Sequence, residues 1–190
     1  MRNTLIIVFT VVVLFVALYH FLIGNFRKPE PEIVKFNEPI KVIGLEIKTN
    51  DKDIYKDVGR VASQFNAIKE KSPIPNLKKP WASINISKDY DPQAGTFVYI
   101  VGDEVTEADS VPDGLKTYEV PAITYAVFTI KPKSKLAWGI TMGRTKRFIY
   151  TEWLPQSGYK PSDIIGDFEL HDDRSLGRHP QISLYVALKE

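Results

Sequence analysis

The sequence predicts an α+β fold: a duplicated strand-helix-strand-strand module with a pseudo-twofold and a central cleft, preceded by one transmembrane helix. Three observations predict it. An apolar run opens the chain, an apolar stripe at helical period lies between strand candidates, and the same order of elements recurs in the second half. An apolar fraction of 44% and a charged fraction of 25% are those of an ordinary globular protein.

The opening run, Leu5 to Ile23, has 19 residues and contains no Asp, Glu, Lys or Arg. At about 1.5 Å per residue it approaches the roughly 30 Å thickness of a hydrocarbon core. We therefore expect residues 1–25 to form an uncleaved single-pass membrane anchor. A cleaved signal peptide is the alternative, but its apolar core is usually about 7–15 residues and ends at a small-residue cleavage site. The segment up to Gly24 offers no such site.

Positive charges near the run predict the side of the membrane on which the following domain lies. Arg2 precedes the run, and four basic residues follow it: Arg27, Lys28, Lys35 and Lys41. The excess of positive charge favours a cytoplasmic location for the domain. Residues 26–38 include Pro29 and Pro31 among charges and predict a stiff linker. Residues 39–190 form the predicted soluble domain.

The first module begins with a strand candidate, Pro39 to Lys48. A helix follows this strand, and Asn50 or Asp51 can be its N-cap. The helix carries one apolar stripe with spacings of four, three, four and three: Ile54, Val58, Val61, Phe65 and Ile68. Such a stripe is typical of core packing. Two strand candidates follow, Trp81 to Ser87 and Thr96 to Val101.

The second module repeats this order. A strand candidate spans Leu115 to Ile130, and a helix follows from about Lys135 to Trp153 before Pro155 and Gly158. Strand candidates at residues 167–172 and 181–188 close the chain. Equivalent elements lie about 80 to 85 residues apart. Two such modules around a pseudo-twofold would leave a concave middle suited to a ligand.

One carboxylate stands out in the last module. Glu169 lies between Phe168 and Leu170, and strands alternate their side chains between two faces. Glu169 therefore shares a face with Asp167 and His171. An ordinary solvent-facing acid and a ligand-facing acid both fit this pattern.

Composition argues against several other functions. Lys+Arg 25 against Asp+Glu 23 gives a net charge of +2, so no basic field indicates a nucleic-acid partner. The absence of cysteine excludes disulfides and cysteine-based zinc sites. His171 and His179 lie in a charged stretch typical of a surface, so we expect no metal site. Neither a phosphate loop nor a nucleophile elbow is present, and we expect no cofactor.

Five segments, in this order, resemble a known family. They are YIVGDEV (Tyr99 to Val105), VPDGL (Val111 to Leu115), VPAITYAVFT (Val120 to Thr129), EWLPQSGY (Glu152 to Tyr159) and DFELHD (Asp167 to Asp172). Together they resemble the GyrI-like effector-binding domain, which also follows the DNA-binding domains of AraC- and MerR-type multidrug regulators. The resemblance covers the whole of residues 39–190.

The resemblance implies a small-molecule pocket between the two modules, with aromatic walls and a buried glutamate facing the ligand. Glu169 matches that glutamate. The candidate ligand-binding residues are Glu169, Tyr99, Tyr125, Phe128, Trp138, Trp153, Tyr159 and Phe168. A carboxylate among aromatic rings suits cationic ligands, and burial there is expected to raise its pKa.

Three functions remain open from the sequence. The first is a membrane-anchored protein that binds amphipathic small molecules, cationic ones included. The second is a hydrolase of reactive small molecules that uses Glu169 with a tyrosine as an acid–base pair. The third is a structural or protein-interaction module without an open cleft. The sequence contains no recognisable DNA-binding domain, so direct control of transcription is not expected.

Overall fold

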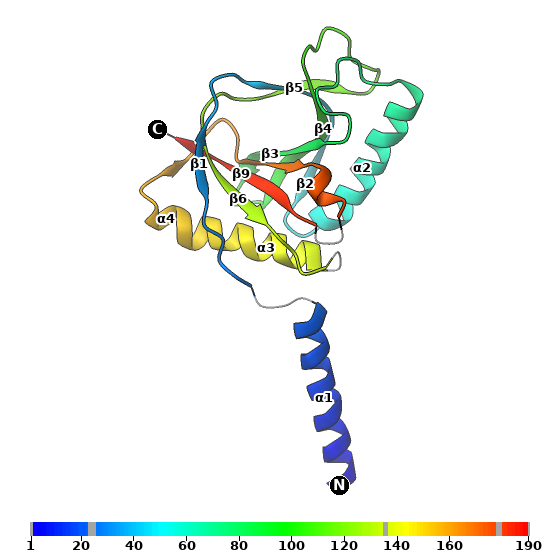
Figure 1. Cartoon of the computed structure of the whole chain (residues 1–190), viewed down its shortest axis with the longest axis vertical. Helices are drawn as coiled ribbons and strands as arrows, with labels where there is room; N and C mark the ends of the chain where they lie inside the picture. The colour runs from blue at the N-terminus through cyan, green and yellow to red at the C-terminus, as the bar shows by residue number, and fades with distance from the viewer. Residues whose placement is uncertain (1, 23–25, 135–136, 178–179, 190) are drawn as a thin grey trace.

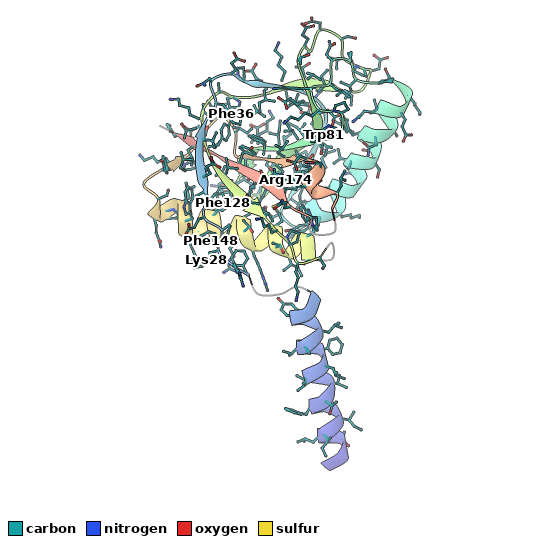
Figure 2. All side chains as sticks on the ribbon, in the orientation of Figure 1. Lys28, Phe36, Trp81, Phe128, Phe148 and Arg174 are labelled. Atoms are coloured by element: carbon teal, nitrogen blue, oxygen red, sulfur yellow. The ribbon has the colours of Figure 1, made fainter. Side chains whose placement is uncertain are left out.

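The computed structural model describes residues 2–22, 26–134, 137–177 and 180–189 (Figure 1). Helix α1, Arg2–Leu22, projects away from the rest of the molecule. Figure 2 shows its drawn side chains pointing outward along most of the helix, and Tyr19 near its end accepts a hydrogen bond from Arg144 of α3 (Trp138–Phe148). Within the described part of the chain, no helix meets the length and apolarity needed to cross a membrane, so the predicted anchor is not supported. The end of the predicted span, Ile23 with Gly24, lies outside the described residues.

The rest of the chain is built on one antiparallel sheet in the order β1-β6-β9-β8-β3-β4-β2-β5, with β7 paired to β9. Its strands are β1 Glu32–Lys35, β2 Ile40–Asn50, β3 Ser83–Asp91, β4 Thr96–Val105, β5 Lys116–Val120, β6 Thr124–Ile130, β7 Lys160–Pro161, β8 Asp167–His171 and β9 Ile182–Lys189. The helices after α1 are α2 Ile54–Lys71, α3 Trp138–Phe148, a π-helical turn Ile149–Trp153, α4 Leu154–Gln156 and a 3-10 turn Asp173–Ser175. An α+β fold with an antiparallel sheet is therefore confirmed.

The strand order has a mirrored arrangement about its centre. The first module, β2-α2-β3-β4, contributes neighbouring strands β3, β4 and β2, and the second, β6-α3-β8-β9, contributes β8, β9 and β6. Strands β3 and β8 join the modules, with Asn85 opposite Glu169. Each module thus places its second strand at the join, its third strand next to it and its first strand beyond.

Helices α2 and α3 cover two separate parts of one face of the sheet, here called the central face. Under α2, Val61 and Phe65 pack with Val101 and other residues of β2 and β4. Under α3, Met142 packs with Phe128 and other residues of β6 and β9. The predicted stripe of α2 is confirmed as core, because Val61 and Phe65 are buried and its other members pack beside them. The middle of the sheet lies between these two cores.

The opposite face of the sheet, here called the far face, has its own core. Phe168 and Ile86 from the middle of the sheet pack there with Val120 of β5. Phe36, next to β1, joins the same core and contacts Tyr125, with ring centroids 5.0 Å apart. Residues from both ends of the sheet thus meet at its middle, which requires a strongly curved sheet.

Several predicted elements have different bounds in the structure, among them the helix predicted from about Lys135 to Trp153, which is α3 followed by the π-helical turn. The strand predicted for Leu115 to Ile130 is two strands, because the chain turns at Pro121 and a proline cannot donate to a ladder. Strand β5 then pairs with β2, whereas β6 pairs with β9. Strand β1 lies inside the predicted linker and pairs with β6. The cap of α2 is Asp53, and Asn50 instead accepts hydrogen bonds in the preceding turn.

Candidate functional site

The strand register places Glu169 in the middle of the central face. Glu169 lies opposite Leu184 on β9 and opposite Asn85 on β3. Leu184 in turn faces Phe128, and Asn85 faces Val101, which belong to the cores under α3 and α2. Directly opposed residues point to the same face of an antiparallel sheet. Polar side chains therefore separate the two apolar cores along the join between the modules.

Glu169 belongs to a charged cluster of four residues: Asp167, Glu169, His171 and Lys146. Lys146 reaches down from α3, and its Nζ lies 2.9 Å from Asp167 Oδ1 and 3.6 Å from Glu169 Oε1. His171 Nε2 donates to Glu169 Oε2 over 3.0 Å. The predicted common face of Asp167, Glu169 and His171 agrees with these contacts. Glu169 is a buried residue and not a solvent-facing acid.

The pKa of Glu169 lies below its ordinary value, contrary to the sequence-based expectation. Burial raises this pKa, but the hydrogen bond from His171 and the charge of Lys146 lower it by more. The expectation of a raised pKa was wrong because it considered aromatic neighbours and no internal cation. Burial lowers the pKa of Lys146, while Asp167 and Glu169 raise it by more, so Lys146 stays charged. The carboxylate and the ammonium thus hold each other in ionised form.

Two tyrosines beside the charged cluster are poor acids. Burial, followed by the charges of Glu169 and Asp167, raises the pKa of Tyr99 well above its usual range. Tyr150 donates to Asp167 Oδ2 over 2.8 Å, and burial together with this acid raises its pKa as well. A general acid and a general base work best with pKa values near the working pH. A weakly basic Glu169 beside weakly acidic tyrosines does not favour the hydrolase alternative.

Asn85 adds an unsatisfied acceptor to the middle of the central face. Asn85 is only 7% exposed, its side chain contacts the Tyr99 hydroxyl, and its Oδ1 has no hydrogen-bond partner among the described residues. A buried polar atom without a partner costs roughly 1–3 kcal/mol. Asn85 lies directly opposite Glu169, so a ligand donor placed there would satisfy both groups.

One stripe of α3 faces the charged cluster. Gly139, Gly143 and Lys146 of α3, with Tyr150 of the π-helical turn after it, follow each other at spacings of four, three and four, which places them on one side of this helical segment. Tyr55 of α2 reaches across to this stripe and donates from its hydroxyl to the Gly139 carbonyl over 3.1 Å. A Cβ atom at Gly143 would lie 2.8 Å from the Tyr55 hydroxyl. The small glycines therefore allow Tyr55 to bridge the two helices above the acids.

The structure brings only part of the predicted aromatic set together around Glu169. Tyr99 is next to it, and Trp138 contacts His171 with ring centroids 6.1 Å apart. Tyr125 and Phe168 instead belong to the core of the far face, so a place beside Glu169 is wrong for both. The alternation of a strand explains Phe168, because it is the immediate neighbour of Glu169.

The remaining predicted residues lie in the α3 part of the molecule. Phe128 is fully buried and contacts Trp153 edge-on, with ring centroids 5.1 Å apart. Trp153 stacks on Tyr159 at 6.4 Å. These three rings extend outward from the core under α3, and Tyr159 is 40% exposed.

A surface cavity of about 160 Å³ opens next to the charged cluster. Its lining residues are Trp138, His171, Ser175 and Pro180. A second cavity, of about 300 Å³, lies among the loops that follow α2 and β4, and its lining includes Pro73 and Pro112. Of these two cavities, the smaller one borders the charged cluster, because its lining includes His171, which contacts Glu169. The smaller cavity is therefore the better candidate for a ligand site.

Sequence reasoning missed Lys146, Tyr150, Tyr55 and Asn85. The repeated spacing from Gly139 to Tyr150 was a usable signal, because two glycines and a lysine on one helix face indicate a close contact and a buried charge. The described residues contain no group of three or more side chains able to hold a metal ion. His179, considered with His171, lies outside the described residues.

Comparison with known proteins identifies the family. Residues 32–188 match the Cass2 family, described as integron-associated effector binding protein. The chain belongs to this family. The match begins at β1, so the Cass2 domain includes residues that the sequence assigned to the linker.

One curated relative is the transcriptional regulator BrlR of Pseudomonas aeruginosa, which is 34% identical over 97 residues. That alignment covers 50% of this chain and 34% of BrlR, so the chain matches about a third of its relative's length.

Solved structures share the fold of this Cass2 domain. An integron cassette protein from Vibrio cholerae has a TM-score of 0.58 at 12% identity, covering 87% of this chain and 99% of that protein. The structure of SAV2435 bound to tetraphenylphosphonium has a TM-score of 0.62 at 11% identity, covering 84% of this chain and 94% of that protein.

Proposed function

We propose that this Cass2 domain binds amphipathic small cations at the central face, with Glu169 as the principal charged contact. The observation that carries the proposal is the buried charged cluster, in which two carboxylates face a single lysine between the two helices. Buried charges are rare unless they are paired, and this cluster has one carboxylate more than it has ammonium groups. A cationic ligand would supply the missing charge.

Two further observations support a ligand at this place. Asn85 Oδ1, next to Glu169, is a buried acceptor that has no hydrogen-bond partner in the part of the chain that the structure describes. Tyr99 and Trp138 provide ring faces for the apolar part of a ligand and attract its positive charge. SAV2435, which shares the fold, was solved with tetraphenylphosphonium, a lipophilic cation of the proposed class.

The test is calorimetric titration with tetraphenylphosphonium. We expect Glu169→Gln to weaken binding by roughly 10- to 100-fold, because a partly desolvated charge contact contributes about 1.5–3 kcal/mol. Asp163→Asn is the matched control, since Asp163 is an exposed acid whose side chain pairs with Lys189. Equal affinities for wild type and Glu169→Gln would remove Glu169 from the binding site.

Membrane attachment through α1 stays a second, separate part of the proposal. The supporting observation is that the apolar side chains of α1 from Leu5 to Leu18 are exposed in the structure. Exposed apolar surface of this kind marks contact with lipid or with another protein. We expect the full chain to sediment with membranes and to resist carbonate extraction, with the domain on the cytoplasmic side. Full-length protein in the soluble fraction would contradict this.

A further inference from the structure

Lys146 occupies the position that a bound cation would take. Its ammonium contacts Asp167 and Glu169, and its side chain is 28% exposed whereas those of the two acids are 6% and 9% exposed. Lys146 therefore lies between the acids and the surface.

The charges of the cluster limit what can join it. The two carboxylates of Asp167 and Glu169 and the one ammonium of Lys146 leave one net negative charge among these three side chains. Tyr99 and Tyr150 stay neutral, because burial and the nearby acids raise the pKa of both. One added positive charge would neutralise this site, and a second would remain uncompensated in a poorly solvated place.

Asn85 gives an independent indication that the site is built for a ligand. Its unpartnered Oδ1 is buried beside Glu169, on the same face of the sheet. Three elements contribute to this place, with Asn85 from β3, Asp167 and Glu169 from β8, and Lys146 from α3, so the arrangement is not a surface run of acids.

We propose that Lys146 is a tethered counter-ion that makes the site selective for singly charged cations over doubly charged cations of the same ring system. This inference rests on the proposed function, because it assigns a charge class to the ligand of that same site. Lys146 neutralises one acid permanently and leaves the other for the ligand. Removing its charge should convert the site to a preference for two positive charges.

Ethidium and propidium test this selectivity, because they share one phenanthridinium ring and propidium carries a second, pendant ammonium group. The full-length chain, free of nucleic acid and in mild detergent, is titrated with each by fluorescence. Wild type is expected to bind ethidium at least about tenfold more tightly. Lys146→Met is expected to reverse this order, because the pendant ammonium then replaces that of Lys146 beside Asp167 and Glu169.

Three controls separate charge from structure. Lys146→Arg keeps the charge and should keep the order of wild type. Lys189→Met removes an exposed lysine that pairs with Asp163 and should change nothing. The double variant Lys146→Met with Glu169→Gln again has one net negative charge and should restore the preference for ethidium. A purely structural role for Lys146 predicts no such restoration.

The outcomes are distinct from those that test the proposed function. If wild type binds propidium more tightly, or if Lys146→Met changes both affinities by the same factor, the selectivity proposal is overturned while cation binding stands. If neither dye binds to wild type or to Lys146→Met, the proposed function itself fails. If Lys146→Met does not fold, the ratio of the ethidium and propidium affinities of wild type tests the selectivity proposal by itself.

Discussion

Glu169 is held ionised by its neighbours, and this has a consequence for stability at acid pH. Its pKa lies below the ordinary value of 4.5, since the hydrogen bond from His171 and the charge of Lys146 outweigh burial. A carboxyl group whose pKa is depressed by folding stabilises the protein above its unfolded pKa. This stabilisation is lost as the pH falls through the folded pKa.

Glu169→Gln should therefore be less stable than wild type near pH 5, by about 1.5–3 kcal/mol, the contribution of a hydrogen bond to a charged group. Below about pH 4.5 the difference should shrink, because wild type then loses the same charge. Urea unfolding of wild type and of Glu169→Gln across this pH range measures the difference in their free energies of unfolding. A difference that grows on acidification would mean that folding raises the pKa of Glu169.

Alternation along one strand was enough to predict the face of Glu169 and its partners Asp167 and His171. It could not predict Lys146, because that contact depends on how a helix lies across the sheet. The aromatic residues show the same limit. Tyr125 and Phe168 are both nearer to Glu169 in sequence than Tyr99 is, but the register of the sheet assigns them to the far face.

We predict that the contact between α2 and α3, made by Tyr55 with Gly139, limits access to the charged cluster. Tyr55 packs on Gly139, where an added Cβ would lie 3.2 Å from the Tyr55 Cδ1 and Cε1 atoms. Tyr55 is 57% exposed, so its ring has room to swing away from a methyl group. Gly139→Ala should accordingly displace the ring without disturbing the sheet.

We expect Gly139→Ala to increase the association rate constant for tetraphenylphosphonium by about 3- to 10-fold, measured by stopped-flow fluorescence. Alanine also gains up to about 1 kcal/mol of helix propensity over glycine, so stability should not fall. Gly59→Ala on α2 is the matched control, since no atom lies within 4 Å of its added Cβ. An unchanged rate in Gly139→Ala would show that Tyr55 does not limit entry.

Helices and strands were predictable where one physical rule governed them. The stripe of α2 follows a strict helical period, and its members form a core as expected. The prediction of one strand from Leu115 to Ile130 was wrong, because the chain turns at Pro121 and passes there from one module to the other. The π-helical turn after α3, which directs Tyr150 towards Asp167, has no local sequence signal.

The whole molecule depends on contacts that join its two ends to its middle. Strand β1 extends the sheet beyond β6, and Phe36 covers the far face with ring centroids 5.8 Å from Tyr185 and 6.3 Å from Phe168. The proline and charged residues of 26–38 predicted a linker, but this segment contains β1. Pairing with β6 is a long-range contact that no local pattern reveals.

A chain that begins at residue 39 should therefore be less stable than one that begins at residue 30. It loses the ladder between β1 and β6 and the ring contacts of Phe36, which together should cost roughly 2–4 kcal/mol. Phe36→Ala in the longer chain separates the ring contribution from that of the strand, and should account for about half of the loss. Urea midpoints followed by tryptophan fluorescence measure all three proteins. Identical midpoints for the two chain lengths would restore residues 26–38 to the role of a linker, with a domain that needs nothing before residue 39.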